Sequence, residues 1–207
     1  MKVLLCVVIG YLLGSISISI LVTKYLFHAD LRQFGSGNAG ATNAARVYGF
    51  GAGLLTFLGD FGKTVLAMCL GRWIGTMGAQ VLGAANGMAI AGAACLLGHC
   101  FPIYFKFKGG KAVSAGAAVG LMIHWKLFLI LVAVFALMAL LTRRVSVCSM
   151  SAAVVLAAGA RWFTHEPALI ALALFTGVLV LVMHRANIKR LLRGEEAPFK
   201  FGKRTKQ

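Results

Sequence analysis

The feature that most constrains this chain is a series of nearly uncharged apolar runs separated by short polar segments. A helix needs about 20 apolar residues to cross the hydrocarbon core of a bilayer, and the first run, Val3–Val22, meets that length without a charged side chain. The run Ala112–Leu141 is long for one crossing, and its central His124-Trp125-Lys126 is typical of a turn at the membrane interface, so we divide it there. The remaining runs are Phe50–Arg72, Gln80–Leu97, Val147–Phe163 and Ala168–Met183.

These runs predict an all-α integral membrane protein with about seven transmembrane helices, or five to six if the shorter segments are re-entrant. The composition agrees, because 60% of the 207 residues are hydrophobic and only 13% are charged, which is typical of membrane proteins. We find no internal repeat and no low-complexity linker. We therefore expect a single membrane domain over residues 1–207, ending in a basic tail at about 185–207.

The positive charge of the chain is concentrated in alternate loops. A net charge of +16 would suggest a nucleic acid partner for a soluble protein, but most Lys and Arg here lie in polar islands at residues 23–48, 98–111, 142–146 and 184–207. Cytoplasmic loops carry the excess of Lys and Arg, so we expect the N-terminus outside, the C-terminus in the cytoplasm, and no nucleic acid partner. All four islands then lie on one face, where they can converge on one pocket.

The first island contains Phe34–Arg46, which is rich in Gly and Asn. We interpret it as too rich in these residues for a stable helix and too polar for lipid. Its glycines allow backbone N–H groups to turn toward an anion, while Asn38, Thr42 and Asn43 add neutral hydrogen-bond groups and Arg46 adds a guanidinium suited to phosphate. The stretch is therefore predicted to form one wall of a phosphate-binding site.

The second island, Gly98–Lys111, alternates aromatic residues with lysines, as interfacial segments do. It ends in Gly109-Gly110-Lys111, where bare backbone beside an ammonium group suits an oxyanion. Within the second apolar run, Asp60 and Lys63 lie at positions i and i+3 and can pair. Structural pairing and a role in the site remain open for them, as do loop support and a site role for His99.

Several chemistries are excluded by what the chain lacks. Five acidic residues leave no cluster for a magnesium site, and no Cys or His spacing suits zinc. The GxGxxG pattern at Gly35–Gly40 lacks the surrounding βαβ unit that binds dinucleotides, and no His-x4-Asp signature of coenzyme A-dependent glycerol acyltransferases is present. Many donors and few bases favour an activated, phosphorylated substrate, without a metal or cofactor.

Three motifs in order resemble the bacterial acyl-phosphate:glycerol-3-phosphate acyltransferases, the PlsY family. The resemblance extends from Gly14-Ser15 to Gly194-Glu195. The family usually has Gly at the position of Ala112 and often an acidic residue at the position of Ala186. The motifs are Ser36-Gly37-Asn38-Ala39-Gly40-Ala41-Thr42-Asn43, then Gly98-His99-Cys100-Phe101-Pro102 running to Phe107-Lys108-Gly109-Gly110-Lys111, then His184-Arg185-Ala186-Asn187-Ile188-Lys189-Arg190-Leu191.

The resemblance implies transfer of an acyl group from acyl phosphate to the 1-hydroxyl of sn-glycerol 3-phosphate, giving lysophosphatidic acid and phosphate in phospholipid biosynthesis. It also implies a multi-pass protein of the bacterial cytoplasmic (inner) membrane, with its site facing the cytoplasm and no coenzyme A. Besides the two substrates and membrane lipids, the soluble enzyme that makes acyl phosphate becomes a candidate partner.

Carried onto this chain, the resemblance implies three groups of site residues. The first phosphate wall would comprise Ser36, Gly37, Asn38, Thr42, Asn43 and Arg46. Gly109, Gly110 and Lys111 would hold the acyl phosphate, and Ser146, Ser149, His184 and Asn187 would complete the glycerol phosphate pocket. Arg46, Lys111, His184 and Asn187 are the candidate catalytic residues, with His184 either a general base or a group that orients the hydroxyl. The alternatives from other classes are a carrier for an organic phosphate and a structural subunit.

Overall fold

The computed structural model describes residues 1–78 and 82–199, and within these residues all regular structure is helical. The long helices match the predicted apolar runs. They are α1 (Lys2–Ser15), α4 (Phe50–Thr76), α5 (Ala84–Cys100), α6 (Val113–Ile123), α7 (Trp125–Thr142), α8 (Val145–Phe163) and α9 (Pro167–Met183). The polar islands add α2 (Ile18–Phe27), η1 (Leu31–Gln33), α3 (Ala41–Tyr48), η2 (Ile103–Phe105) and α10 (Arg185–Leu192).

The predicted helical membrane fold is confirmed. Five stretches in the described part of the chain are long and apolar enough to cross a bilayer, and a sixth is obtained if α9 and α10, bent by 56° to each other, count as one. Helix α6 is apolar but shorter, and the predicted turn at His124 separates it from α7. Seven crossings and the direction of insertion remain predictions.

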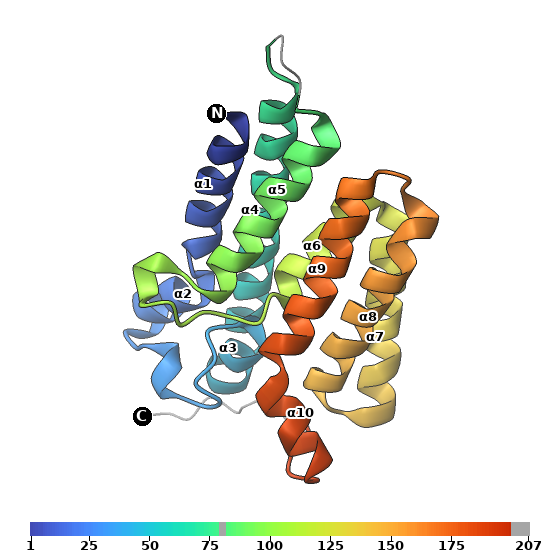
Figure 1. The fold of residues 1–207 in the computed structure, drawn as a ribbon. Coiled ribbons are helices and arrows are strands. Elements are labelled where there is room, and N and C mark those ends of the chain that lie inside the picture. Colours follow the sequence, from blue (N-terminus) through green and yellow to red (C-terminus); the bar gives the residue numbers. More distant parts are fainter. Residues whose placement is uncertain (79–81, 200–207) are drawn as a thin grey trace.

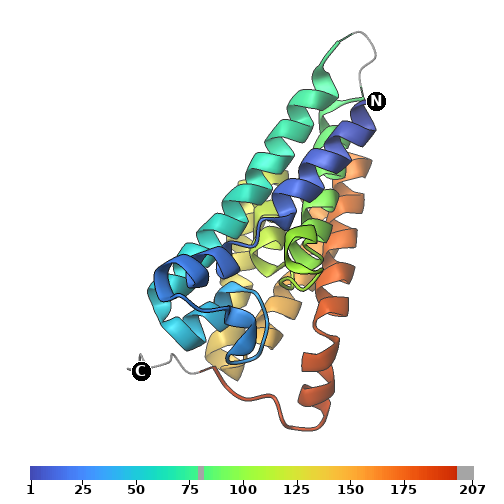
Figure 2. The same cartoon turned by 90° about the vertical axis from the view of Figure 1, so that its left-hand side faces the viewer.

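The helices form two groups that meet along α5, α6 and α9 (Figure 1). Helices α1, α4 and α5 pack side by side (Figure 2), and α7 and α8 lie on the other side of α6 and α9 (Figure 1). Buried side chains from α4 to α9 fill the space between them, including Met68, Leu96, Val119, Leu127 and Leu156.

Helices in the first group approach closely because glycines face backbone at their crossings. A Cβ added at Gly14 of α1 would lie 2.1 Å from the carbonyl oxygen of Cys95, and one added at Gly71 of α4 would lie 2.2 Å from that of Gly87. Small residues allow this contact between helices in membranes, where van der Waals packing drives association. These crossings fix the frame of α1, α4 and α5, next to which the loops of the first two polar islands lie.

Gly14→Ala is expected to destabilise the protein, because its methyl group meets backbone and the two helices must separate. Overpacking of this kind costs about 1 to 3 kcal/mol. The melting temperature of the purified protein measures the effect. Gly62→Ala is the matched control, since a Cβ on that α4 glycine meets open space; an equal loss in both variants would contradict the packing argument.

One local expectation was wrong. Phe34–Arg46 was expected to be non-helical throughout, but α3 begins at Ala41. Its alanines are strong helix formers, and Ala44 and Ala45 are buried. The predicted first span lies within Lys2–Phe27, which is long and apolar enough to cross a bilayer, and extended backbone at Ile16-Ser17 divides it into α1 and α2. Residues 79–81 and 200–207, which include the start of the predicted third span and the end of the predicted basic tail, lie outside the described residues.

Candidate active site

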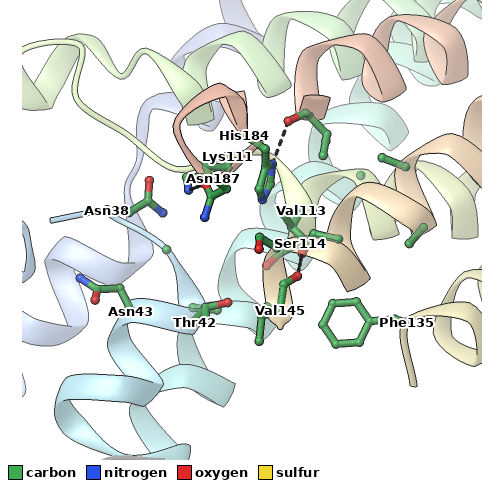
Figure 3. Close-up of a pocket in the computed structure, with 18 of the residues that line it drawn as sticks. Asn38, Thr42, Asn43, Lys111, Val113, Ser114, Phe135, Val145, His184 and Asn187 are labelled. Carbon is green, nitrogen blue, oxygen red and sulfur yellow. Dashed lines mark hydrogen bonds between the residues drawn. The ribbon is translucent and has the colours of Figure 1, made fainter. Parts of the chain in front are cut away.

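A cavity of about 1020 Å³ is lined by residues from all four polar islands. Figure 3 shows Lys111, Asn187 and His184 close together, with Asn38, Asn43 and Thr42 on one side and Phe135 on the other. These residues come from segments that are far apart in the sequence, from Asn38 to Asn187. The convergence of the islands on one end of the helices is therefore a property of the fold.

A series of polar contacts connects the second loop, which lies between α5 and α6 and contains Lys111, to α10 and the segment that follows it. The Nζ of Lys111 donates to Oδ1 of Asn187 at 2.5 Å, and Nδ2 of Asn187 donates to Oε1 of Glu196 at 2.7 Å. The other oxygen of Glu196 accepts from Nε of Arg190 at 2.6 Å. Glu196 thereby fixes the orientation of the Asn187 amide, whose oxygen then faces the Lys111 ammonium.

The pKa values of Lys111 and Glu196 are shifted by their surroundings. Burial lowers the pKa of Lys111, and the nearby cations Arg190 and Arg46 lower it further. Burial acts to raise the pKa of Glu196, but hydrogen bonds from Asn187 and Arg190 outweigh it, so the pKa of that carboxyl lies below its ordinary value. Burial and the neighbouring cations thus destabilise the charged form of the half-buried Lys111. An anion bound beside the ammonium group would offset this cost, which favours phosphate binding there.

His184 lies at the bend between α9 and α10, with its side chain buried and facing the cavity. Its Nδ1 lies 2.8 Å from the carbonyl oxygen of Val180. A carbonyl can only accept, so Nδ1 carries the proton and Nε2 of the neutral ring is left as an acceptor. Burial lowers the pKa of His184 to about 4, with nearby Lys111 adding to the shift.

Asn43, whose side chain is fully buried, fixes the conformation of the first loop, which lies between α2 and α3. Its Oδ1 accepts from the backbone N–H of Ser36 at 2.9 Å, and its Nδ2 donates to the carbonyl of Phe34 at 3.0 Å. Gly35 adopts φ +61°, and a Cβ there would lie 2.3 Å from the same Oδ1. Asn43 therefore folds the loop that presents Ser36, Asn38 and the start of α3 to the cavity.

His99, at the end of α5, packs against the second loop at Gly110. The N–H of Gly110 donates to the carbonyl of His99 at 3.0 Å. A Cβ on Gly110 would lie 2.2 Å from Nε2 of His99 and 3.0 Å from the carbonyl oxygen of Ala39, which belongs to the first loop. The two loops therefore touch across Gly110, and only glycine fits between them.

Gly110→Ala is expected to weaken substrate binding, because the new methyl group pushes the Lys111 loop away from His99 and Ala39. A shift of this size raises KM for a phosphorylated substrate by about tenfold, equivalent to about 1.4 kcal/mol of binding. Steady-state kinetics measure it. Gly51→Ala, whose Cβ meets nothing within 4 Å, is the control and keeps wild-type KM; the same KM in Gly110→Ala would refute the tight-contact argument.

The cavity continues between α6, α7 and α8 into an apolar region. Its walls there are formed by Val113, Leu131, Phe135, Ala153 and Leu156. The apolar and cationic parts belong to one cavity, so a single ligand can place an anionic group at Lys111 and a hydrocarbon chain among these side chains.

The segment after α10 turns back and covers the cationic end of the cavity. Gly194 makes the turn with φ +72°, and the carbonyl of Glu196 accepts from Nε of Arg144 at 2.9 Å. The N–H of Phe199 donates to the carbonyl of Arg143 at 2.8 Å, and the Arg46 guanidinium lies 5.8 Å from the Phe199 ring centroid. This cover is made entirely by residues near the C-terminal end of the described chain.

The structure brings most of the sequence-predicted site residues to this cavity. The lining includes Ser36, Gly37, Asn38, Thr42, Asn43, Arg46, Lys111, Ser146, Ser149, His184 and Asn187. Gly109 and Gly110 do not line it and instead pack against the end of α5. Lining residues that sequence reasoning did not select include Ser114, Arg190, Glu196 and Phe199, and Asp60 and His99, which were left open, line it as well.

No group of three or more His, Cys, Asp or Glu side chains is placed to hold a metal ion within residues 1–78 and 82–199. Asp60 pairs with Lys63 at 2.7 Å, as the i,i+3 spacing predicted. The cationic donors of the cavity are Arg46, Lys111 and Arg190, and the exposed Lys106 and Lys108 do not line it.

Comparison with known proteins gives one consistent family. The family model described as glycerol-3-phosphate acyltransferase matches residues 4–194. The glycerol-3-phosphate acyltransferase of Caulobacter vibrioides is 40% identical over 200 residues, covering 97% of this chain and 88% of the relative. That of Staphylococcus saprophyticus is 37% identical over 203 residues, covering 97% of this chain and all of the relative.

Two solved structures have the same fold. A crystal structure of PlsY, an integral membrane glycerol 3-phosphate acyltransferase, in its glycerol 3-phosphate form superposes with a TM-score of 0.87 and 32% identity, covering 97% of this chain and 96% of the other. A lysophosphatidic acid form gives a TM-score of 0.85 and 30% identity, covering 97% of each chain. The chain therefore belongs to the glycerol-3-phosphate acyltransferase family, in its integral membrane PlsY form.

Proposed function

We propose that this protein transfers an acyl group from acyl phosphate to the 1-hydroxyl of sn-glycerol 3-phosphate, releasing lysophosphatidic acid and phosphate without coenzyme A. The observation that carries the proposal is the union of a cationic pocket at Lys111 and Arg46 with an apolar region at Phe135 in one cavity. An acyl phosphate has this combination of a phosphate head and a hydrocarbon tail. The solved PlsY forms with glycerol 3-phosphate and lysophosphatidic acid support the acceptor and the product.

In the proposed reaction, the glycerol hydroxyl oxygen forms a bond to the acyl carbonyl carbon, and the bond from that carbon to the phosphate oxygen breaks. Lys111 and Arg46 stabilise the negative charge that collects on the departing phosphate. Binding both reactants side by side supplies much of the remaining acceleration. Ser36, Gly37, Asn38 and Thr42 are proposed to contact phosphate oxygens, while Asn43 shapes the loop that carries them.

The proton of the hydroxyl is proposed to pass to the leaving phosphate. His184 has a pKa of about 4, which makes its neutral ring a weak base, whereas the second pKa of a phosphoryl group lies near 6. Nε2 of His184 then accepts a hydrogen bond from the attacking hydroxyl and orients it. Ser146, Ser149 and Asn187 are proposed to hold the glycerol phosphate beside it.

Location and partners follow from the same proposal. Because most Lys and Arg belong to the four polar islands, whose residues line the cavity, we place this end of the molecule in the cytoplasm, in the bacterial inner membrane. Both phosphorylated substrates reach it there, and the soluble enzyme that makes acyl phosphate is the partner that delivers the donor.

The proposal is tested with purified protein, acyl phosphate and glycerol 3-phosphate, with neither coenzyme A nor metal in the buffer. Formation of lysophosphatidic acid together with inorganic phosphate in equal amounts is expected. A parallel reaction receives acyl-coenzyme A in place of acyl phosphate. Product only in the second reaction would disprove the proposed donor while leaving the acceptor in place.

A further inference from the structure

A buried cluster of ionisable side chains lies beneath the two phosphate loops. The carboxylate of Asp60, in α4, is 1% exposed. Its Oδ1 lies 2.7 Å from Nζ of Lys63 and 3.5 Å from Nδ1 of His99. Holding such groups at membrane depth is costly unless they pair, and intramembrane ionisable residues commonly have functions.

On one side, the cluster contacts the start of the helix that precedes the first loop. Nζ of Lys63 donates to the carbonyl oxygen of Ile16 at 2.6 Å. Ile16 lies at the break between α1 and α2, and α2 leads directly into the loop that carries Ser36 and Asn38. Lys63 therefore connects Asp60 to the start of α2, the helix that precedes the first phosphate loop.

On the other side, the cluster contacts the second loop. His99 faces Asp60 with Nδ1, while Nε2, on the opposite side of the ring, lies where a side chain on Gly110 would be. The carbonyl of His99 also accepts from the Gly110 N–H. Lys111 is the next residue, so a rotation of the His99 ring moves the backbone that presents the Lys111 ammonium.

We propose that Asp60 and His99 are positioning residues for acyl transfer, because their pair, with Lys63, fixes the separation of the two phosphate loops. Asp60 holds the ring of His99 under Gly110 and, through Lys63, holds the break that precedes the first loop. The inference rests on the proposed function. It adds a positioning role for three buried residues, of which Asp60 and His99 line the cavity.

The decisive variant is the double substitution D60L/K63M. Replacing a buried ion pair by apolar side chains of similar size is often neutral for folding, so the melting temperature is expected to stay within about 5 °C of the wild type. The ring of His99 loses its partner, however, and KM for acyl phosphate or for glycerol 3-phosphate is expected to rise at least tenfold. A folded D60L/K63M protein with wild-type KM and kcat would overturn the proposal.

His99→Leu provides a second route to the same result, because it removes the ring that supports Gly110. If the residues act as one unit, adding His99→Leu to D60L/K63M causes no further loss beyond about threefold, whereas independent effects would multiply. If D60L/K63M does not fold, His99→Leu decides alone, and wild-type kinetics in that variant would overturn the proposal. His99→Asn, which retains a donor toward Asp60, is expected to recover part of the loss.

Thr56→Val is the matched control. Thr56 is buried in α4 one turn before Asp60, its hydroxyl donates to its own helix at Ala52, and it does not line the cavity. Its kinetics are expected to equal those of the wild type. Stabilisation of each variant by glycerol 3-phosphate alone is measured in parallel, so that failure of the proposed donor is distinguished from failure of the positioning role.

Discussion

Lys111→Ala is expected to reduce turnover by about 10² to 10³, the usual cost of removing one group that stabilises developing charge in a transition state. Lys111 is the cation at the centre of the cavity, held by Asn187 at 2.5 Å. When the acyl–phosphate bond breaks, negative charge collects on the phosphate oxygens beside it. The loss should appear in kcat with either route for the proton, because the charge on the phosphate develops in both.

Lys108→Ala is the control for this variant. Lys108 lies in the same island but is exposed and does not line the cavity, so near wild-type turnover is expected. Lys111→Arg tests geometry as well as charge, because a guanidinium cannot replace an ammonium in a confined site without moving its neighbours, and only partial activity is expected. Full turnover in Lys111→Ala would remove Lys111 from the proposed mechanism.

The features that the sequence predicted correctly are those that depend on neighbouring positions. Helices follow from apolar runs because bilayer thickness sets their length, and the pairing of Asp60 with Lys63 follows from i,i+3 spacing alone. The turn at His124 was likewise visible, since polar and aromatic residues interrupt an apolar run there. None of these features requires knowledge of how the helices pack.

The features that were not predicted depend on contacts between distant segments. Helix α3 forms in a stretch rich in Gly and Asn because the burial of Ala44 and Ala45 adds to the helix preference of its alanines. His99 meets Asp60 because α4 and α5 pack against each other, with their backbones in close contact at Gly71 and Gly87. Glu196 reaches Asn187 through the turn at Gly194, and a glycine after a basic helix end was the available signal for that turn.

The second large effect is expected for His184→Ala, which should lower kcat by about 10² or more, within the range for groups that act on the transferred proton. In the proposed mechanism Nε2 of His184 accepts a hydrogen bond from the attacking hydroxyl, and the phosphate takes the proton. His184→Gln, whose amide oxygen can accept the same hydrogen bond, should then retain about a tenth of wild-type turnover. If His184 is the base, both variants lose activity equally.

The pH dependence separates the same two roles by a second measurement. Because burial lowers the pKa of His184 to about 4, the ring is neutral across pH 5.5 to 8. The pH profile of kcat should therefore have no inflection near pH 6.5 that belongs to His184, and the profiles of the wild type and His184→Gln should have the same shape.

The dependence of stability on pH follows from the same lowered pKa. An unfolded histidine binds a proton below pH 6.5, while the folded one stays neutral down to about 4, so stability is lost as pH falls through this window, by up to about 3 kcal/mol. His184→Gln should lose this part of the acid sensitivity. A melting temperature whose pH dependence is the same in His184→Gln as in the wild type would show that folding does not lower the pKa of the ring, and a ring with an ordinary pKa would favour His184 as the base.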